Sequence, residues 1–315
     1  MSPEDLAKAL AQPGRASIPY FDRHNPDRPL VLECFRPQSH DPDKPVVIVQ
    51  HGASRNGSEY CEAWIPAAER NGLLIVAITF SKDTWPDALT YNNGHVLDED
   101  GNLRQRESWS QAIHGRVFAL LREGGITQRD KAHLWGHSAG GQFVHRLLAT
   151  QSHDIFEAVG AANPGWYTLP TLDLHYPDGL GGIGLTRDDI VRFLGYRLVI
   201  FSGDQDIDGT AENFPRHESA MAQGPNRFAR AQFYIDRGRA EAAKLGVPCR
   251  WSRVVVPGVA HEGMRMSAFA DRYWFGARGQ PRPERSASAA QLRRLSTPVY
   301  ATRSGLLSDP VPGIS

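Results

Sequence analysis

Ser138 stands in a pattern that could make it a nucleophile. It is the centre of Gly136-His137-Ser138-Ala139-Gly140, which follows an apolar run at 132–135 and precedes a helical pattern at 141–151. A G-x-S-x-G between a strand and a helix lifts the serine hydroxyl above the sheet, on a crowded turn that glycines permit. The helix N-terminus adds free N–H groups and a positive dipole. The pattern therefore predicts nucleophilic catalysis by Ser138, with a purely structural serine as the alternative.

A histidine follows later in the chain, where such a nucleophile needs a base. A serine hydroxyl is a poor nucleophile at neutral pH until a base removes its proton. His261 ends the run Pro257-Gly258-Val259-Ala260-His261, which follows a predicted strand at 251–256. The order nucleophile, acid, histidine is the one that this kind of turn requires. We therefore assign His261 as the base.

The acid is expected in an aspartate-rich turn after the predicted strand at 197–201. Asp206 lies three residues after Gly203, a spacing that clears the turn and lets the carboxylate reach the imidazole. Asp204 and Asp208 are the alternatives, and the aspartates that are not the acid would form turns. Asp206 is the favoured assignment.

Backbone amides near the front of the sheet could stabilise an oxyanion. The predicted strand 46–49 leads through Gln50 into His51-Gly52-Ala53-Ser54. The amides of Ala53 or Ser54, together with the amide of Ala139, are expected to form an oxyanion hole. His51 itself is expected to shape this loop rather than to act as a second base.

The substrate pocket is expected beneath long connections at 81–108, 163–196 and 210–226, because loops of such length are usually functional. Aromatic side chains could line an acyl or aromatic pocket, and packing in the core is the alternative for each of them. The candidates for the pocket wall are His137, Trp85, Trp166 and Tyr167.

The elements that would position these residues alternate between short apolar runs and longer amphipathic runs. Nearly continuous Val, Ile and Leu runs are typical of strands that helices cover on both faces, and alternation of strand and helix implies right-handed crossovers. The sequence therefore predicts an α/β fold with a mostly parallel central sheet and helices on both faces. Strands are expected at 46–49, 73–78, 132–135, 155–160, 197–201 and 251–256, with a weaker edge strand at 30–35, and helices at 58–71, 109–122, 141–151, 228–245 and 262–275.

Three regions are expected along the chain. Residues 1–29 would form an N-terminal helix and a lead-in, and residues 30–276 a catalytic domain with loop insertions at 81–108 and 163–196. Residues 277–315 are rich in Arg, Pro, Ser and Ala, which predicts a basic C-terminal extension that is flexible or wraps the surface.

Composition excludes several classes of partner. The 315 residues include 35 basic and 35 acidic side chains, and the pI is about 7.2, so neither nucleic acid nor a membrane surface is an expected partner. The three cysteines are far apart in the sequence and indicate no disulfide framework. No signal-peptide pattern or membrane-spanning run is visible, so a cytoplasmic location is expected. The oligomeric state stays open.

No metal or organic cofactor is expected. Residues 179–184 match G-x-G-x-x-G, but the run before them contains Pro177 and does not read as the strand that a dinucleotide site needs. Asp204-x-Asp206-x-Asp208-Gly209 copies half of a calcium loop, but Pro215 stands where the loop needs glutamate.

Four motifs together resemble the α/β-hydrolase superfamily of the serine esterase type: His51-Gly52, Gly136-x-Ser138-x-Gly140, Gly203-x-x-Asp206 and Gly258-x-x-His261. This resemblance covers about residues 30–276. More narrowly, the chain is similar to the polyhydroxybutyrate-depolymerase-like and feruloyl-esterase-like branch. The resemblance implies the α/β-hydrolase fold and a triad of Ser138, Asp206 and His261. Secreted depolymerases of that branch carry a leader and disulfides, and neither is visible in this sequence.

The expected function is the hydrolysis of carboxylic esters through an acyl-enzyme, on a small-molecule or oligomeric ester substrate. A peptidase or thioesterase that uses the same triad is one alternative. A catalytically idle binding module is another, although such modules commonly lose a triad member and this sequence keeps all three.

Overall fold

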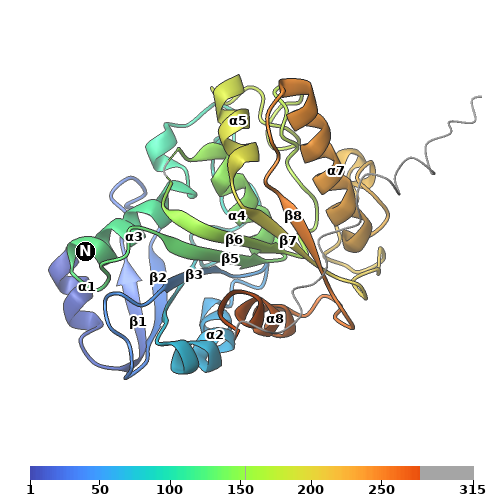
Figure 1. Ribbon diagram of the computed structural model, residues 1–315. Helices are drawn as coiled ribbons and strands as arrows, with labels where there is room; N and C mark the ends of the chain where they lie inside the picture. Colours follow the sequence, from blue (N-terminus) through green and yellow to red (C-terminus); the bar gives the residue numbers. More distant parts are fainter. Residues whose placement is uncertain (153, 277–315) are drawn as a thin grey trace, which may run out of the picture. The chain divides into compact units, whose positions relative to one another are not determined.

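Eight strands form one sheet in the computed structural model of the chain, which describes residues 1–152 and 154–276 (Figure 1). They are β1 (Gly14–Tyr20), β2 (Leu30–Arg36), β3 (Val46–Gln50), β4 (Leu74–Thr79), β5 (Ala132–His137), β6 (Phe156–Ala162), β7 (Leu198–Gly203) and β8 (Ser252–Val256). Their order across the sheet is β1-β2-β4-β3-β5-β6-β7-β8. β2 is antiparallel to β1 and β4, whereas β3 to β8 pair in parallel. The prediction of a mostly parallel α/β sheet is confirmed.

Helices cover both faces of the sheet, as Figure 1 shows. On one face lie α2 (Gly57–Asn71) and α8 (Gly263–Phe275), and on the other lie α3 (Ala112–Glu123), α4 (Ala139–Thr150), α5 (Arg187–Gly195) and α7 (Arg227–Leu245). The remaining helices are short: α1 (Pro3–Ala9), η1 (Arg106–Ser108) and α6 (Glu218–Met221).

The apolar run of β3 follows from this layering. Val46 and Ile48 pack into the core cluster that contains residues of α3 and α4, and Val47 and Val49 pack into the cluster that contains residues of α2 and α8. All four side chains are fully buried. Because both faces of the strand are covered, no polar residue is needed to face water.

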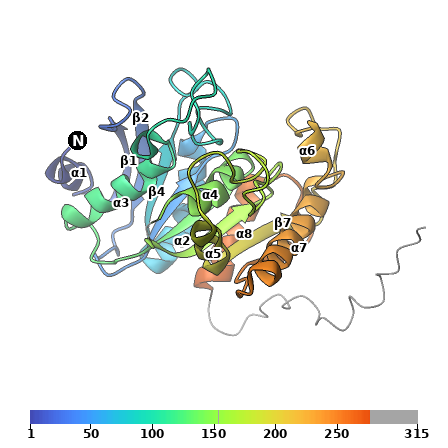
Figure 2. The ribbon, with the colours of Figure 1, turned by 90° about the horizontal axis from the view of Figure 1, so that it is seen from above.

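The N-terminal segment joins the sheet, which the sequence did not predict. Residues 14–20 pair with β2 as an antiparallel edge strand, so the strand predicted at 30–35 is real but does not lie at the edge. The reason is composition: of the seven residues in β1 only Ile18 and Tyr20 are buried, too few to make an apolar pattern. Figure 2 shows α1 and β1 at one end of the sheet, with α6 and α7 toward the other.

The parallel strands bring the loops that follow β3, β5, β7 and β8 to one edge of the sheet, where sites of α/β proteins form. The long connections at 81–108 and 163–196 end in η1 and α5 respectively. The C-terminal extension predicted for 277–315 lies outside the described residues. Within the described part of the chain, no helix is both long enough and apolar enough to cross a membrane.

Candidate active site

Ser138 lies on a tight turn between β5 and α4. It is the N-cap residue of α4, and its φ of +58° falls in the left-handed region that residues with a side chain rarely adopt. Glycines on either side make the turn possible. A Cβ at Gly136 would lie 2.3 Å from the carbonyl oxygen of Gly140, and a Cβ at Gly140 would lie 2.2 Å from the carbonyl oxygen of Gln50. The close approach of α4 to β5 therefore excludes a side chain at Gly136, and the close approach of α4 to the end of β3 excludes one at Gly140.

We expect Gly140→Ala to lower the free energy of unfolding by about 3 kcal/mol, because the new methyl group would collide with backbone atoms of β3 that cannot rotate away. Urea unfolding followed by circular dichroism measures this difference. Gly195 in α5 is the matched control, since a Cβ there would meet nothing within 4 Å. Gly195→Ala should be neutral or stabilise by up to about 1 kcal/mol. Equal stability of the two variants would contradict the close approach.

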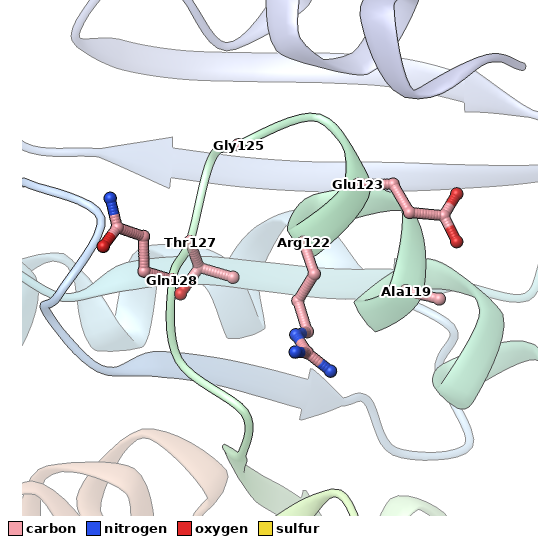
Figure 3. A pocket seen from close by; sticks show the side chains of 6 residues that line it. All are labelled: Ala119, Arg122, Glu123, Gly125, Thr127 and Gln128. Carbon is pink, nitrogen blue, oxygen red and sulfur yellow. The ribbon is translucent and has the colours of Figure 1, made fainter.

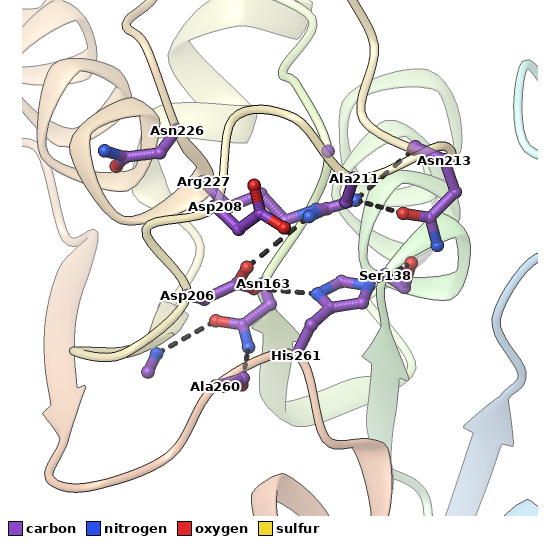
Figure 4. A network of polar contacts seen from close by, with 12 residues as sticks. Ser138, Asn163, Asp206, Asp208, Ala211, Asn213, Asn226, Arg227, Ala260 and His261 are labelled. Atoms are coloured by element: carbon purple, nitrogen blue, oxygen red, sulfur yellow. Dashed lines mark hydrogen bonds and ion pairs between the residues drawn. The ribbon is translucent and has the colours of Figure 1, made fainter.

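The side chains of Ser138, His261 and Asp206 form a continuous chain of hydrogen bonds (Figure 4). Nε2 of His261 lies 2.9 Å from Oγ of Ser138, and Nδ1 of His261 lies 2.7 Å from Oδ2 of Asp206. The other carboxylate oxygen, Oδ1, lies 3.4 Å from Nη1 of Arg227. Ser138 and His261 are half-buried, whereas Asp206 is 3% exposed. The structure thus brings together the three residues that the sequence assigned as nucleophile, base and acid.

The other two aspartates of the turn bond to main-chain groups instead. Oδ1 of Asp204 accepts a hydrogen bond of 2.8 Å from the backbone N–H of Gly258, in the loop after β8. Oδ1 of Asp208 accepts hydrogen bonds from both the backbone N–H and the hydroxyl of Thr210, two residues later. Of the three aspartates considered, Asp206 is therefore the one that is hydrogen-bonded to the imidazole.

Asn163 joins the loop that carries Asp206 to the loop that carries His261, a role that the sequence did not indicate (Figure 4). It follows β6 with a φ of +43°. Its Oδ1 accepts a hydrogen bond of 2.9 Å from the N–H of Gly203, and its Nδ2 donates one of 2.9 Å to the carbonyl of Ala260. A single buried amide thus fixes the spacing between the acid loop and the histidine loop.

His137 and Tyr60 form a second polar pair behind these residues. The hydroxyl of Tyr60, on α2, hydrogen-bonds Nδ1 of His137 at 2.8 Å, and the His137 ring packs against the His261 ring at a centroid distance of 4.7 Å. Burial lowers the pKa of His137 well below its usual value, and the charges of His261 and Arg227 add to this effect. His137 is 3% exposed. In the structure His137, which the sequence assigned to the pocket wall, is a buried neutral side chain that packs on His261.

The loop after β3 reaches the nucleophile. A Cβ at Gly52 would lie 3.6 Å from Cβ of Ser138, so the loop backbone passes close to the serine. Ala53 and Ser54 come next and are exposed, while Ala139 begins α4 on the other side of the serine. The loop after β3 and the first turn of α4 thus both adjoin Ser138, where the sequence predicts an oxyanion hole formed from backbone amides.

Buried side chains hold that loop in place. Arg55 has a φ of +62°, donates to the carbonyl of Phe80 at 3.1 Å and lies 3.9 Å from the ring centroid of Tyr91. His51 accepts a hydrogen bond of 3.0 Å at Nε2 from the backbone N–H of Phe80, and the hydroxyl of Tyr91 donates to the His51 carbonyl. Burial lowers the pKa of His51 to about 3, so this histidine is neutral. His51 occupies the loop-shaping position that the sequence suggested.

The aromatic residues predicted for the pocket wall are buried and pack against other side chains. Trp85 and Tyr167 have no exposed surface; Trp85 packs on Phe80, and Tyr167 stacks on Tyr234. The structure therefore places both in the core rather than on a pocket wall. Trp166 is 6% exposed and covers the guanidinium of Arg146 at 4.6 Å.

The hollow drawn in Figure 3 lies away from Ser138. It has a volume of about 450 Å³ and lies between the end of α3 and the start of β5, whereas Ser138 follows the other end of β5. Its lining residues are Ala119, Arg122, Glu123, Gly125, Thr127 and Gln128. Among the residues that the structure describes, no three His, Cys, Asp or Glu side chains cluster in a way that could hold a metal ion.

Comparison with known proteins finds similar hydrolases among solved structures. The sequence matches no family model and no curated protein. Among solved structures it is similar to LpqC, a poly(3-hydroxybutyrate) depolymerase from Bordetella parapertussis, with 46% identity and a TM-score of 0.85 over 94% of this chain and 99% of that one. It is also similar to poly(aspartic acid) hydrolase-1 from Sphingomonas sp. KT-1, with 34% identity and a TM-score of 0.80 over 83% of this chain and 98% of that one.

A more distant structure shares only the fold. An S-formylglutathione hydrolase from Agrobacterium tumefaciens is 16% identical, with a TM-score of 0.53 over 82% of this chain and 91% of that one. The higher identities extend over nearly the full length of the two hydrolases compared above. The chain therefore belongs to the α/β-hydrolase family, in its poly(3-hydroxybutyrate) depolymerase-like branch.

Proposed function

We propose that the protein hydrolyses carboxylic esters, with Ser138 as nucleophile, His261 as general base and Asp206 as the acid that orients the histidine. The observation that carries the proposal is the continuous hydrogen bonding from Ser138 through His261 to Asp206, at 2.9 and 2.7 Å. Groups held at such distances suit the transfer of a proton from a hydroxyl to an imidazole.

The reaction would follow two steps. His261 removes the Ser138 proton as Oγ attacks the ester carbonyl, and the protonated imidazole then gives that proton to the leaving alcohol. Water, activated by the same histidine, attacks the acyl-enzyme and releases the acid. Asp206 stabilises the imidazolium in both steps through its Oδ2.

The oxyanion of each tetrahedral intermediate needs donors that are in place before the reaction. The amide of Ala139 at the start of α4 and the amides of Ala53 or Ser54 in the loop after β3 are the proposed donors. Both segments adjoin Ser138, and Arg55 and Tyr91 fix the shape of the loop. Each such donor contributes roughly 3–4 kcal/mol to the stabilisation of the transition state.

A polymer or an oligomer is the substrate class that the relatives favour. The 46% identical structure is a poly(3-hydroxybutyrate) depolymerase, and that polymer is an ester. The 34% identical structure is a poly(aspartic acid) hydrolase, and that polymer is an amide, which makes amide hydrolysis the second candidate function. The intact contacts of Ser138, His261 and Asp206 argue against a binding module that has lost catalysis.

The first experiment is hydrolysis of p-nitrophenyl esters with acyl chains from C2 to C12, with and without a fluorophosphonate probe. We expect turnover that the probe abolishes and a probe adduct on Ser138. p-Nitroanilides with the same acyl groups are the matched controls, because they place an amide in the same position. Faster turnover of the anilides would favour the amidase, whereas absence of both turnover and labelling would contradict the proposed mechanism.

A further inference from the structure

Asp206 has two side-chain partners, one on each carboxylate oxygen. Its Oδ2 faces His261 at 2.7 Å, and its Oδ1 faces Nη1 of Arg227 at 3.4 Å (Figure 4). The side chains of Asp206 and Arg227 are each only 2% exposed. A carboxylate in such a site is costly to bury unless its charge is balanced and both its oxygens have partners. Arg227 supplies the second partner.

Arg227 is itself held by residues of the segment that follows Asp206 in the chain. Its Nη2 donates to Oδ1 of Asn213 at 2.9 Å and to the Asn213 carbonyl at 3.3 Å, and its guanidinium lies 5.3 Å from the ring centroid of Phe214. It is the first residue of α7, and the carbonyl of Asp206 accepts from the N–H of Phe228, the next residue in that helix, at 3.2 Å. The start of α7 therefore meets Asp206 through a side chain and through the backbone.

We propose that Arg227 is a positioning residue for the reaction. It fixes the orientation of the Asp206 carboxylate, and its positive charge partly offsets the negative charge that Asp206 exerts on His261. The inference rests on the proposed function, because it assigns Arg227 a role through Asp206 and not through the substrate. A rigid fork of N–H donors can bond Asp206 and Asn213 at once, which a lysine ammonium on a flexible stem cannot do with the same geometry.

The second part of the role is electrostatic. Arg227 places a positive charge beside the carboxylate that faces His261. Without that charge the carboxylate would stabilise the imidazolium more strongly, and the acidic limb of the pH–rate profile would move to higher pH. Burial lowers the pKa of Arg227, but a guanidinium remains charged under these conditions.

Other charged and titratable groups around the pair do not duplicate this effect. His137 packs on His261 but is neutral, and Tyr60 and Tyr167 are uncharged because burial raises the pKa of each hydroxyl. Exposed Glu262 pairs with Arg265 on the surface. The remaining groups act at longer range or are bonded elsewhere: Asp204, Asp208 and Arg230.

The test compares Arg227→Met with Arg227→Lys, using kcat and KM across pH for a p-nitrophenyl ester. Arg227→Met should lower kcat by about 10²-fold with little change in KM, because a misplaced base costs rate and the Arg227 side chain is buried. The acidic limb of the pH–rate profile of this variant should move to higher pH by roughly 0.5–1 pH unit. Arg227→Lys should keep the acidic limb of the pH–rate profile at its wild-type position, because lysine retains the positive charge. Its kcat should fall roughly tenfold, because lysine lacks the rigid set of N–H donors of the guanidinium.

Arg253→Met is the matched control. Arg253 is a half-buried arginine of β8 that packs near α7, and its guanidinium bonds Ser202, Gln232 and the carbonyl of Phe228. It should leave kcat and the acidic limb close to wild type. An equal shift of the limb in Arg227→Met and Arg253→Met, or no shift in either, would overturn the electrostatic role.

A second variant covers the case in which Arg227→Met does not fold, as judged by circular dichroism. Asn213→Ala removes the side-chain bond that holds Arg227 without removing its charge. Asn213→Ala should lower kcat severalfold without changing KM, and the acidic limb of its pH–rate profile should stay at the wild-type pH. Wild-type kcat in both Arg227→Lys and Asn213→Ala would overturn the proposal. If wild-type protein hydrolyses esters and Ser138→Ala does not, the proposed function stands whatever these variants show.

Discussion

Replacing Ser138 with alanine is expected to lower kcat for ester hydrolysis by about 10⁶-fold, the scale seen when the nucleophile of a hydrogen-bonded triad is removed. Alanine has no Oγ, so His261 has no proton to take and no acyl-enzyme can form. The fold should survive, because alanine keeps the Cβ and the strain at a φ of +58° is the same for both residues. Steady-state hydrolysis of a p-nitrophenyl ester measures the rate, and thermal unfolding tests the fold.

Ser202 offers the matched control for that variant. Ser202 is buried near the end of the parallel strand β7, and its hydroxyl accepts a hydrogen bond of 2.8 Å from Nε of Arg253, whereas the hydroxyl of Ser138 bonds His261. Ser202→Ala should cost about 1 kcal/mol in stability and leave kcat within a fewfold of wild type. Appreciable turnover by pure Ser138→Ala protein, insensitive to the fluorophosphonate probe, would show that another residue performs the attack.

The parts of the site that depend on local pattern could be predicted from the sequence. Glycines at 136 and 140 mark a turn too crowded for a side chain, and the structure accounts for both positions by backbone contacts. Asp206 and His261 each follow a strand end, and parallel strands bring such ends to one edge of the sheet. Residue type, spacing and strand order therefore suffice to bring the three side chains together.

The supporting contacts could not be predicted, because they join residues that are distant in sequence. Asn163 bonds to Gly203 and Ala260 from a different strand, and nothing in its neighbourhood in the sequence marks it. Arg227 stands at the start of a helix, where an arginine is an ordinary residue that usually faces solvent. Only the fold shows that these two side chains turn inward toward the acid and histidine loops.

Aromatic side chains were ambiguous for a different reason. Trp85 and Tyr167 lie in long connections, which favoured a pocket wall, yet both are fully buried. A large apolar side chain gains similar free energy by burial in a core or in a pocket, so its type and position in a loop do not separate the two. β1 was not predicted for another reason: only two of its seven side chains are buried, so it has no apolar pattern.

The Asp206→Asn variant is expected to lose about 10⁴-fold in kcat, since an amide in this position favours the wrong tautomer of the histidine. The amide nitrogen is a donor only, so it cannot accept the hydrogen bond that Nδ1 of His261 donates to Oδ2 of Asp206. The change also leaves Arg227 buried without an anion, and breaking a buried ion pair on one side costs about 3–5 kcal/mol in stability. Unlike Ser138→Ala, this variant should therefore lose both rate and melting temperature.

Asp204→Asn and Asp208→Asn are the matched controls, because they make the same chemical change within two residues of the acid. Each of these carboxylates is bonded to main-chain groups, so we expect kcat to fall less than tenfold and a stability loss of about 1 kcal/mol. A larger loss of kcat in Asp204→Asn than in Asp206→Asn would overturn the assignment of the acid. Equal losses in all three variants would mean that the turn, and not one carboxylate, controls the histidine. The distances favour a single carboxylate, because only that of Asp206 bonds the imidazole among the described aspartates of the turn.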